Sequence, residues 1–276
     1  MKMPLLFKNS PVFLLGFFLF LTPPASALEK PFDHSAWDQF LKAYVNDKGQ
    51  LNFQMAKKDP RLLTEYLQQL GAIPLEQFDA SWPREERLAV WLNAYHAGVV
   101  RVILDHYPVR SIHDIPGVWD LPLVRIGKQS FSLNGIRSIQ LIEIFRDEKI
   151  HVALACGARS CPRFRREAYT GPRAEGQLFL ATREFVNAPE YNQITPGEKT
   201  IFLSHLFKWY EQDFTLDFGS PENDSKLSPQ QMAVLSFIVH YLEDAKKIEY
   251  LEARRYKVKY LPFEWALNES APAASS

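Results

Sequence analysis

The sequence predicts an α+β fold: a single domain in which a mixed small β-sheet and surrounding helices enclose a central buried helix. Apolar residues make up 46% of the 276 residues, which is enough for a packed core and excludes a disordered or collagen-like chain. One long helical segment, 84–107, is apolar or small on both of its sides. Strand and helix patterns are mixed without regular βαβ alternation, and this favours α+β over α/β.

The first 27 residues have the pattern of a secretory signal peptide. Lys2 and Lys8 precede an apolar run at 11–22, and residues 25–27 supply a small-x-small cleavage site. The run is shorter than the roughly 20 residues that cross a bilayer. We therefore expect an exported protein, periplasmic rather than fully secreted, with no membrane span after signal cleavage.

Residues 28–268 form one predicted domain, and 269–276 form a predicted disordered tail rich in Ser and Ala. No internal repeat or long linker divides the chain. Lys plus Arg and Asp plus Glu both number 32, so the overall charge gives no reason to expect a nucleic-acid partner.

The periodicity of apolar residues predicts the helices of the first half. Helical spacing occurs at 37–44 and at 63–70, where Gly71 supplies a stop. The segment 84–107 is the strongest helix, and Pro108 helps to end it. Because this segment has no charged face along its middle, we expect it to be central and buried.

Strands are predicted by short apolar runs between turn residues. A hairpin is expected at 123–126 and 129–133, joined by Gly127-Lys128. The run at 150–155 is typical of a buried strand. Further strands are expected at 200–203 and 256–260.

A helix of the second half is predicted from its first residues. Ser228-Pro229-Gln230-Gln231 has the pattern of a capping box with Pro at the first helical position. The apolar residues that follow indicate a buried helix.

The segment 151–162, HVALACGARSCP, is the most informative part of the chain. It holds the two cysteines, Cys156 and Cys161, and in an exported protein such a pair suggests a disulfide. The alternative is a catalytic Cys156 thiolate in a positive field. Such a field is available from the loop arginines: Arg159, Arg163, Arg165, Arg166 and Arg173.

Asn93 and His96 form a polar pair on the predicted buried helix. They are three residues apart and project from the same side. Burying such groups without partners costs about 1–3 kcal/mol each. The pair is therefore either a site, with His96 as base and Asn93 as orienting group, or a structural hydrogen-bond network. His151 is a poorer base, because residues 151 and 156 of a strand point to opposite faces.

No cofactor or metal is expected. The seven histidines do not occur in a metal-binding motif. The chain also has no phosphate loop, no GxGxxG and no GxSxG.

Three segments together resemble the domain-of-unknown-function 547 family: WLNAY at 91–95, SLN at 132–134 and the segment 151–162. Residues 203–210 and 265–268 fit its later pattern. The resemblance covers most of 49–268 and implies a fold without an established activity. The chain departs from the family pattern at His96, where the family usually has Asn, and at 136–138, where Ile-Arg-Ser stands for Ile-Glu-His.

Two functions are compatible with this sequence. The first is a cysteine-dependent hydrolase or acyl transferase acting on a peptide-like envelope substrate. Cys156 would be its nucleophile, His96 its base and Asn93 the orienting group. Arg159, Ser160 and Arg163 would bind the anionic part of the substrate.

The second function is a non-catalytic binding or assembly module. It would have a Cys156–Cys161 disulfide and an Arg-rich loop that binds an anionic envelope substrate or protein partner. The state of Cys156, free thiol or half-cystine, discriminates between the two. A dyad also needs His96 within about 6 Å of the Cys156 sulfur, because a general base must reach its proton directly or through one water.

Overall fold

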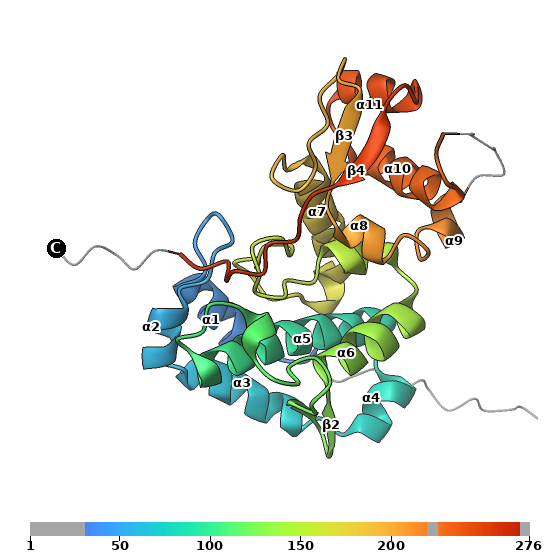
Figure 1. The fold of residues 1–276 in the computed structure, drawn as a ribbon. Coiled ribbons are helices and arrows are strands. Elements are labelled where there is room, and N and C mark those ends of the chain that lie inside the picture. The colour runs from blue at the N-terminus through green and yellow to red at the C-terminus, as the bar shows by residue number, and fades with distance from the viewer. Residues whose placement is uncertain (1–30, 220–225, 271–276) are drawn as a thin grey trace, which may run out of the picture.

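The computed structural model describes residues 31–219 and 226–270 (Figure 1). The predicted signal peptide at 1–27 lies outside these ranges, and so do residues 271–276 of the predicted tail. Within the described ranges, no helix has both the length and the apolar character that a membrane crossing requires. The architecture is helix-rich with small sheets, which confirms the α+β prediction.

Helices α1 to α5 come first in the described part of the chain and lie in the lower part of Figure 1. They are α1 (Ser35–Tyr44), α2 (Phe53–Lys58), α3 (Arg61–Gly71), α4 (Leu75–Ser81) and α5 (Arg84–His106). The long helix α5 is buried over most of its length, including the polar Asn93 and His96. It was predicted as the central helix, and the structure confirms this because α2, α3 and α7 (Ala174–Asn187) all pack against it.

The predicted hairpin follows α5 and the short 3₁₀ turn η1 (Ile112–Asp114). Strands β1 (Val124–Ile126) and β2 (Gln129–Phe131) pair antiparallel. Gly98 allows β1 to lie against α5, because a Cβ there would be 2.3 Å from a methyl group of Val124. The chain continues through α6 (Leu133–Gly135) into the π-helical segment η2 (Ile136–Glu143).

The predicted strand at 150–155 is wrong. Residues Glu148–Val152 form a 3₁₀ helix, η3, which starts where the Asp147 side chain accepts a hydrogen bond from the Lys149 amide. Ile150 is fully buried in this helical turn. A short apolar run indicates burial but does not distinguish a strand from a buried turn. The strand argument against His151 therefore fails as well.

The second half contains the remaining helices and the second sheet. After η4 (Gly171–Arg173), they are α7 (Ala174–Asn187), β3 (Thr200–Leu203), α8 (Leu206–Trp209), α9 (Thr215–Phe218), α10 (Pro229–Tyr241), α11 (Ala245–Glu252) and β4 (Lys257–Tyr260). The strands β3 and β4 pair in parallel. The expected small sheet is thus two separate two-stranded sheets, β1–β2 and β3–β4.

The start of α10 confirms the predicted capping box. The Ser228 side chain accepts from the Gln231 amide, and the Gln231 side chain accepts from the Ser228 amide. These bonds satisfy backbone groups that a helix start otherwise leaves unpaired.

The apolar core has two main clusters, one around α5 and one around α7, α10 and the β3–β4 sheet. In Figure 1 the first lies at the bottom and the second at the top. We call the region between them the seam. A third, small cluster lies there and contains Cys156 and Cys161.

The chain crosses the seam again after β4. Residues 262–270, which we call the C-terminal strap, run from the upper half back to the lower half (Figure 1). The Asn268 amide donates to the Gly157 carbonyl, and the Leu51 amide donates to the Asn268 carbonyl. Glu269 and Ser270, assigned to the predicted tail, also have partners: the Tyr107 hydroxyl and the Leu51 carbonyl.

Candidate functional site

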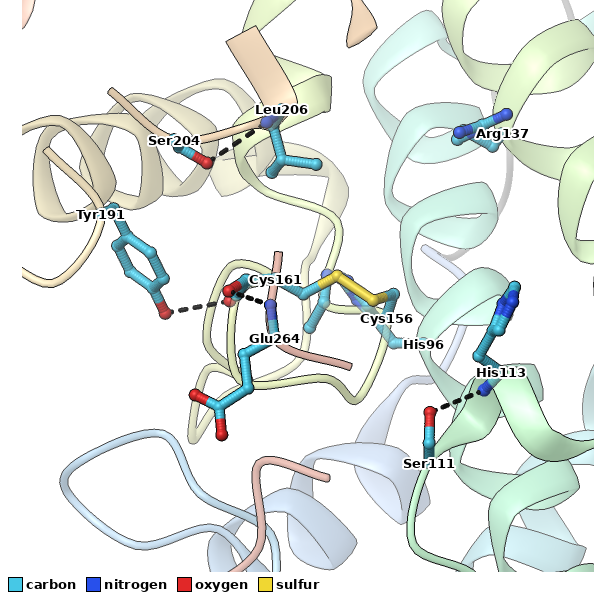
Figure 2. Close-up of a disulfide and its surroundings, with 12 residues drawn as sticks. His96, Ser111, His113, Arg137, Cys156, Cys161, Tyr191, Ser204, Leu206 and Glu264 are labelled. Carbon is cyan, nitrogen blue, oxygen red and sulfur yellow. Dashed lines mark hydrogen bonds between the residues drawn. A yellow bond between two sulfur atoms is a disulfide. The ribbon is translucent and has the colours of Figure 1, made fainter. Parts of the chain in front are cut away.

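Cys156 and Cys161 are joined by a disulfide at the centre of the seam (Figure 2). Both cysteines are buried, and the Cys161 carbonyl accepts a hydrogen bond from the Tyr191 hydroxyl at 2.9 Å. Gly157 has a φ of +84°, and a Cβ there would lie 2.6 Å from Ile103. The loop between the cysteines is therefore tightly constrained. While the disulfide is closed, Cys156 has no thiolate to act as a nucleophile.

His96 forms a hydrogen bond with the backbone just before Cys156. Its Nε2 accepts a hydrogen bond from the Ala155 amide at 3.0 Å, so this nitrogen holds no proton and its lone pair is occupied. Burial lowers the pKa of His96 to about 4. The imidazole is therefore neutral at pH 7, and its Nε2 is not free to accept a proton from a thiol.

Asn93 joins three segments in the first core cluster. Its side chain donates to the Tyr169 carbonyl at 2.8 Å and accepts from the Tyr169 amide at 3.0 Å. It also lies 3.0 Å from Nδ1 of His34. Every polar atom of the Asn93 amide is thus engaged, as expected for a buried structural group.

Carboxylates compensate the loop arginines. The ion pairs are Arg159–Glu264, Arg163–Glu190, Arg165–Glu167, Arg165–Glu184, Arg166–Asp47 and Arg173–Glu167. Most of these acids are far from the loop in sequence, which is why the arginines look unopposed there. Ser160 also has a partner, because its hydroxyl accepts from the Glu264 amide at 2.8 Å. The loop therefore binds the rest of the protein, including the C-terminal strap.

The seam contains a pocket of about 350 Å³, which we call the seam pocket. A volume of this size is typical of small-molecule sites. The disulfide forms part of its wall, and both core halves contribute residues. The lining consists of Tyr95, Trp119, Asn134, Arg137, His151, Leu154, Cys156, Cys161, Leu206, Trp209, Tyr210, Phe263 and Trp265.

Aromatic rings make up one side of the seam pocket. Trp265 lies at the centre, with ring centroids 6.2 Å from Trp119, 6.0 Å from Trp209 and 4.4 Å from Phe263. Trp209 is 45% exposed. Within the described ranges, no hydrogen bond engages the three indole N–H groups. Flat apolar surfaces with unused donors are thus available to a ligand.

Arg137 is the positive charge of the seam pocket (Figure 2). Its guanidinium donates to the Tyr210 hydroxyl and, at 3.2 Å, to the side-chain oxygen of Asn134. It also lies over the Tyr210 ring at 5.2 Å. Among the described residues, no carboxylate lies within ion-pair distance of it, and none lines the pocket. Arg137 therefore differs from the loop arginines, because its hydrogen bonds go to neutral oxygens and theirs go to carboxylates.

His151 and Asp213 meet at the wall of the seam pocket. The His151 Nε2 lies 2.8 Å from a carboxylate oxygen of Asp213, and its ring stacks on Tyr210 at 4.2 Å. Burial lowers the pKa of His151, although Asp213 acts in the opposite direction. The contact with His151 holds the pKa of Asp213 below its ordinary value.

A second, acidic cavity lies on the other side of this pair. It has a volume of about 380 Å³, and its charged or titratable lining residues are Glu143, Arg146, Asp147, Glu148, His151, Asp213 and Asp217. In the part of the chain that the structure describes, no three His, Cys, Asp or Glu side chains are grouped as metal ligands.

The sequence reasoning did not find most of this pocket. Arg137 was named only within Ile-Arg-Ser at 136–138, as a departure from the family pattern. The pocket lining spans residues 95 to 265, so its members come together only in the fold. The one usable signal was Arg137, a cation where the family pattern has an acid.

Residues 80–186 match the model of a family described as "Protein of unknown function, DUF547". The match supports the family resemblance and includes α5, Arg137 and both cysteines. It ends before Trp209, Tyr210 and the C-terminal strap. Comparison with curated proteins and with solved structures gave no significant match. The family description states no activity.

Proposed function

We propose that this protein is a non-catalytic binding module whose seam pocket holds a small organic ligand with a flat, largely apolar body. The observation that carries the proposal is the aromatic side of the pocket, where Trp119, Trp209 and Trp265 have no hydrogen-bond partner for their indole N–H groups among the described residues. Binding sites of small molecules are typically apolar clefts with a few polar groups that orient the ligand.

The contacts of Cys156 and His96, the predicted nucleophile and base, favour binding over catalysis. A thiol enzyme needs a thiolate and a base that can reach it. Cys156 is in a disulfide, and His96 Nε2 is bonded to the Ala155 amide. The hydrolase or acyl-transferase alternative therefore requires a reduced Cys156 and a different base.

The proposal places the protein outside the cytoplasm, in the periplasm. Its support is the signal-peptide pattern at 1–27 together with the disulfide, because disulfides persist in oxidising compartments. The predicted anionic partner would bind at the seam pocket rather than at the arginine-rich loop, because carboxylates already pair with Arg159 and Arg163.

Binding of a neutral aromatic dye tests this function. We expect N-phenyl-1-naphthylamine to bind the wild-type protein with a blue-shifted emission. The substitution Trp209→Ala should weaken binding about tenfold, because burying a large aromatic surface contributes on the order of 1.5–3 kcal/mol. Trp209 is 45% exposed and lies outside the two main core clusters, so its loss should leave the fold intact.

Phe179→Ala is the matched control. Phe179 is 42% exposed, similar to the 45% of Trp209, but it lies on α7 outside the pocket lining. Its loss should not change the affinity for the dye. Equal effects of the two substitutions, or no saturable binding to the wild-type protein, would contradict the proposed function.

A further inference from the structure

The hydrogen-bonding character of the seam pocket indicates the charge of its ligand. Indole N–H groups only donate, and a guanidinium has five donors and no acceptor. The pocket contains three indoles and Arg137, and no carboxylate among its lining residues. The Tyr95 hydroxyl adds a further group without a hydrogen-bond partner among the described residues. A ligand with acceptor atoms can therefore form hydrogen bonds with this lining.

The way in which Arg137 is held leaves its charge available. Its two hydrogen bonds go to neutral oxygens, those of Tyr210 and Asn134. The side-chain amide of Asn134 in turn donates to Asp120 at 2.8 Å, which fixes its oxygen toward Arg137. These contacts orient the guanidinium without neutralising its charge. Its remaining N–H groups can still form bidentate hydrogen bonds with an oxyanion.

Asp213, the acid beside His151, is already engaged. Asp213 pairs with His151 at 2.8 Å, and it lies beyond ion-pair distance from Arg137. Arg137 does help to lower the pKa of Asp213, so the two charges interact weakly across the pocket wall. This interaction reduces the positive field at Arg137 but does not occupy the guanidinium.

We infer that the ligand of the seam pocket is an aromatic carboxylate, whose carboxylate Arg137 binds while the ring lies against the tryptophans. The inference rests on the proposed function, because it names the chemical class that the same pocket accepts. The volume of about 350 Å³ accommodates one or two fused rings with a short acidic substituent.

The test compares two probes of nearly the same shape by isothermal titration calorimetry at pH 7. The probes are 2-naphthoate, which is ionised, and 2-naphthamide, which is neutral. We expect the wild-type protein to bind the naphthoate about tenfold more tightly, as a charge-assisted contact to a guanidinium predicts. Arg137→Gln should abolish this preference and leave naphthamide binding within about threefold of the wild-type value.

Two further variants complete the design. Arg137→Lys keeps the positive charge but lacks the bidentate donor geometry of a guanidinium. It should therefore retain an intermediate preference for the naphthoate. Arg183→Gln is the matched control, because Arg183 also lies over an aromatic ring, that of Phe179, but pairs with Glu243 outside the pocket. It should bind both probes as the wild-type protein does.

The outcomes separate the inference from the proposed function. Equal affinity of the wild-type protein for the two probes, or a preference that survives Arg137→Gln, overturns the inference and leaves the binding function in place. Failure of both probes to bind the wild-type protein overturns the proposed function, and the inference fails with it. Loss of both probes in Arg137→Gln, with its fold intact by circular dichroism, also overturns the inference, because the residue would then shape the pocket rather than select charge.

Discussion

Three buried histidines keep neutral rings inside this protein. Burial lowers the pKa of His34 and of His96 to about 4, and it lowers the pKa of His151 as well. A charged imidazole is poorly solvated in such surroundings, and the ordinary value near 6.5 is restored only when the chain unfolds. Each ring therefore links protonation to unfolding.

The sign of this linkage predicts a loss of stability in mild acid. Between pH 6.5 and pH 4 the unfolded chain binds more protons than the folded one, so stability is present above pH 6.5 and is lost as the pH falls toward 4. For His34 and His96 we expect the free energy of unfolding to be lower by about 1 kcal/mol each at pH 5.5 than at pH 7. Urea denaturation at the two pH values measures this difference.

His113→Gln provides a control for that experiment. His113 is exposed on η1, unlike the three buried histidines. Glu86 and Glu148 have raised pKa values because of burial, and they act in the opposite direction at lower pH. The comparison therefore stays above pH 5. A free energy of unfolding that does not fall between pH 7 and pH 5.5 would contradict the prediction.

The loop between the two cysteines is the element that organises the seam. Arg159 and Ser160 within it form backbone hydrogen bonds with Ala266 and Glu264 of the C-terminal strap. These bonds place Phe263 and Trp265 at the pocket. The disulfide thus stabilises the pocket wall in addition to closing a short loop.

Removal of this disulfide should affect stability and binding together. Closing a loop of this length stabilises the folded protein by about 2 kcal/mol in the chain-entropy model. We expect Cys156→Ser combined with Cys161→Ser to lower the free energy of unfolding by that amount and to weaken dye binding. Mass spectrometry of the wild-type protein should show two iodoacetamide labels only after reduction. Rapid labelling of Cys156 without reductant would instead favour the thiol-enzyme alternative.

Elements with strong local signals could be predicted from the sequence. The buried helix α5 has a long stripe of apolar residues, β1–β2 has a Gly-Lys turn, and α10 has a complete capping box. The conformation at η3 could not be predicted, because the run at 150–155, apolar or small except for His151, fits a buried strand equally well. The Asp147 cap and the burial of Ile150 accompany the helical turn that forms there instead.

The candidate site was less predictable than the fold. Asn93 and His96 were correctly placed on one buried helix, and their spacing could not tell a structural network from a catalytic pair. The loop arginines looked like an anion site because their partners, such as Glu190 and Glu264, are distant in sequence. Arg137 and Trp265 are more than a hundred residues apart, and no local pattern brings them together.

At the scale of the whole molecule, the seam pocket depends on both core clusters. Tyr95 and Arg137 belong to the α5 side, Leu206 and Trp209 belong to the β3–β4 side, and the strap supplies Trp265. A ligand in this position contacts both halves and should stabilise them against separation. At a concentration of 100 times its Kd, a ligand adds about 2.7 kcal/mol to the free energy of unfolding.

Removal of the C-terminal strap should have the largest effect on the stability of the whole molecule. Its backbone hydrogen bonds reach Leu51, Arg110, Gly157 and Arg159, and each such bond contributes about 0.5–1.5 kcal/mol. A chain that ends at Tyr260 should therefore lose at least about 3 kcal/mol of stability and all dye binding. A chain that ends at Ser270 keeps every one of these bonds and should match the full-length protein. Guanidinium denaturation and dye titration measure both quantities. Undiminished binding by the chain that ends at Tyr260 would show that the pocket does not need the strap, because Phe263 and Trp265 would then be dispensable.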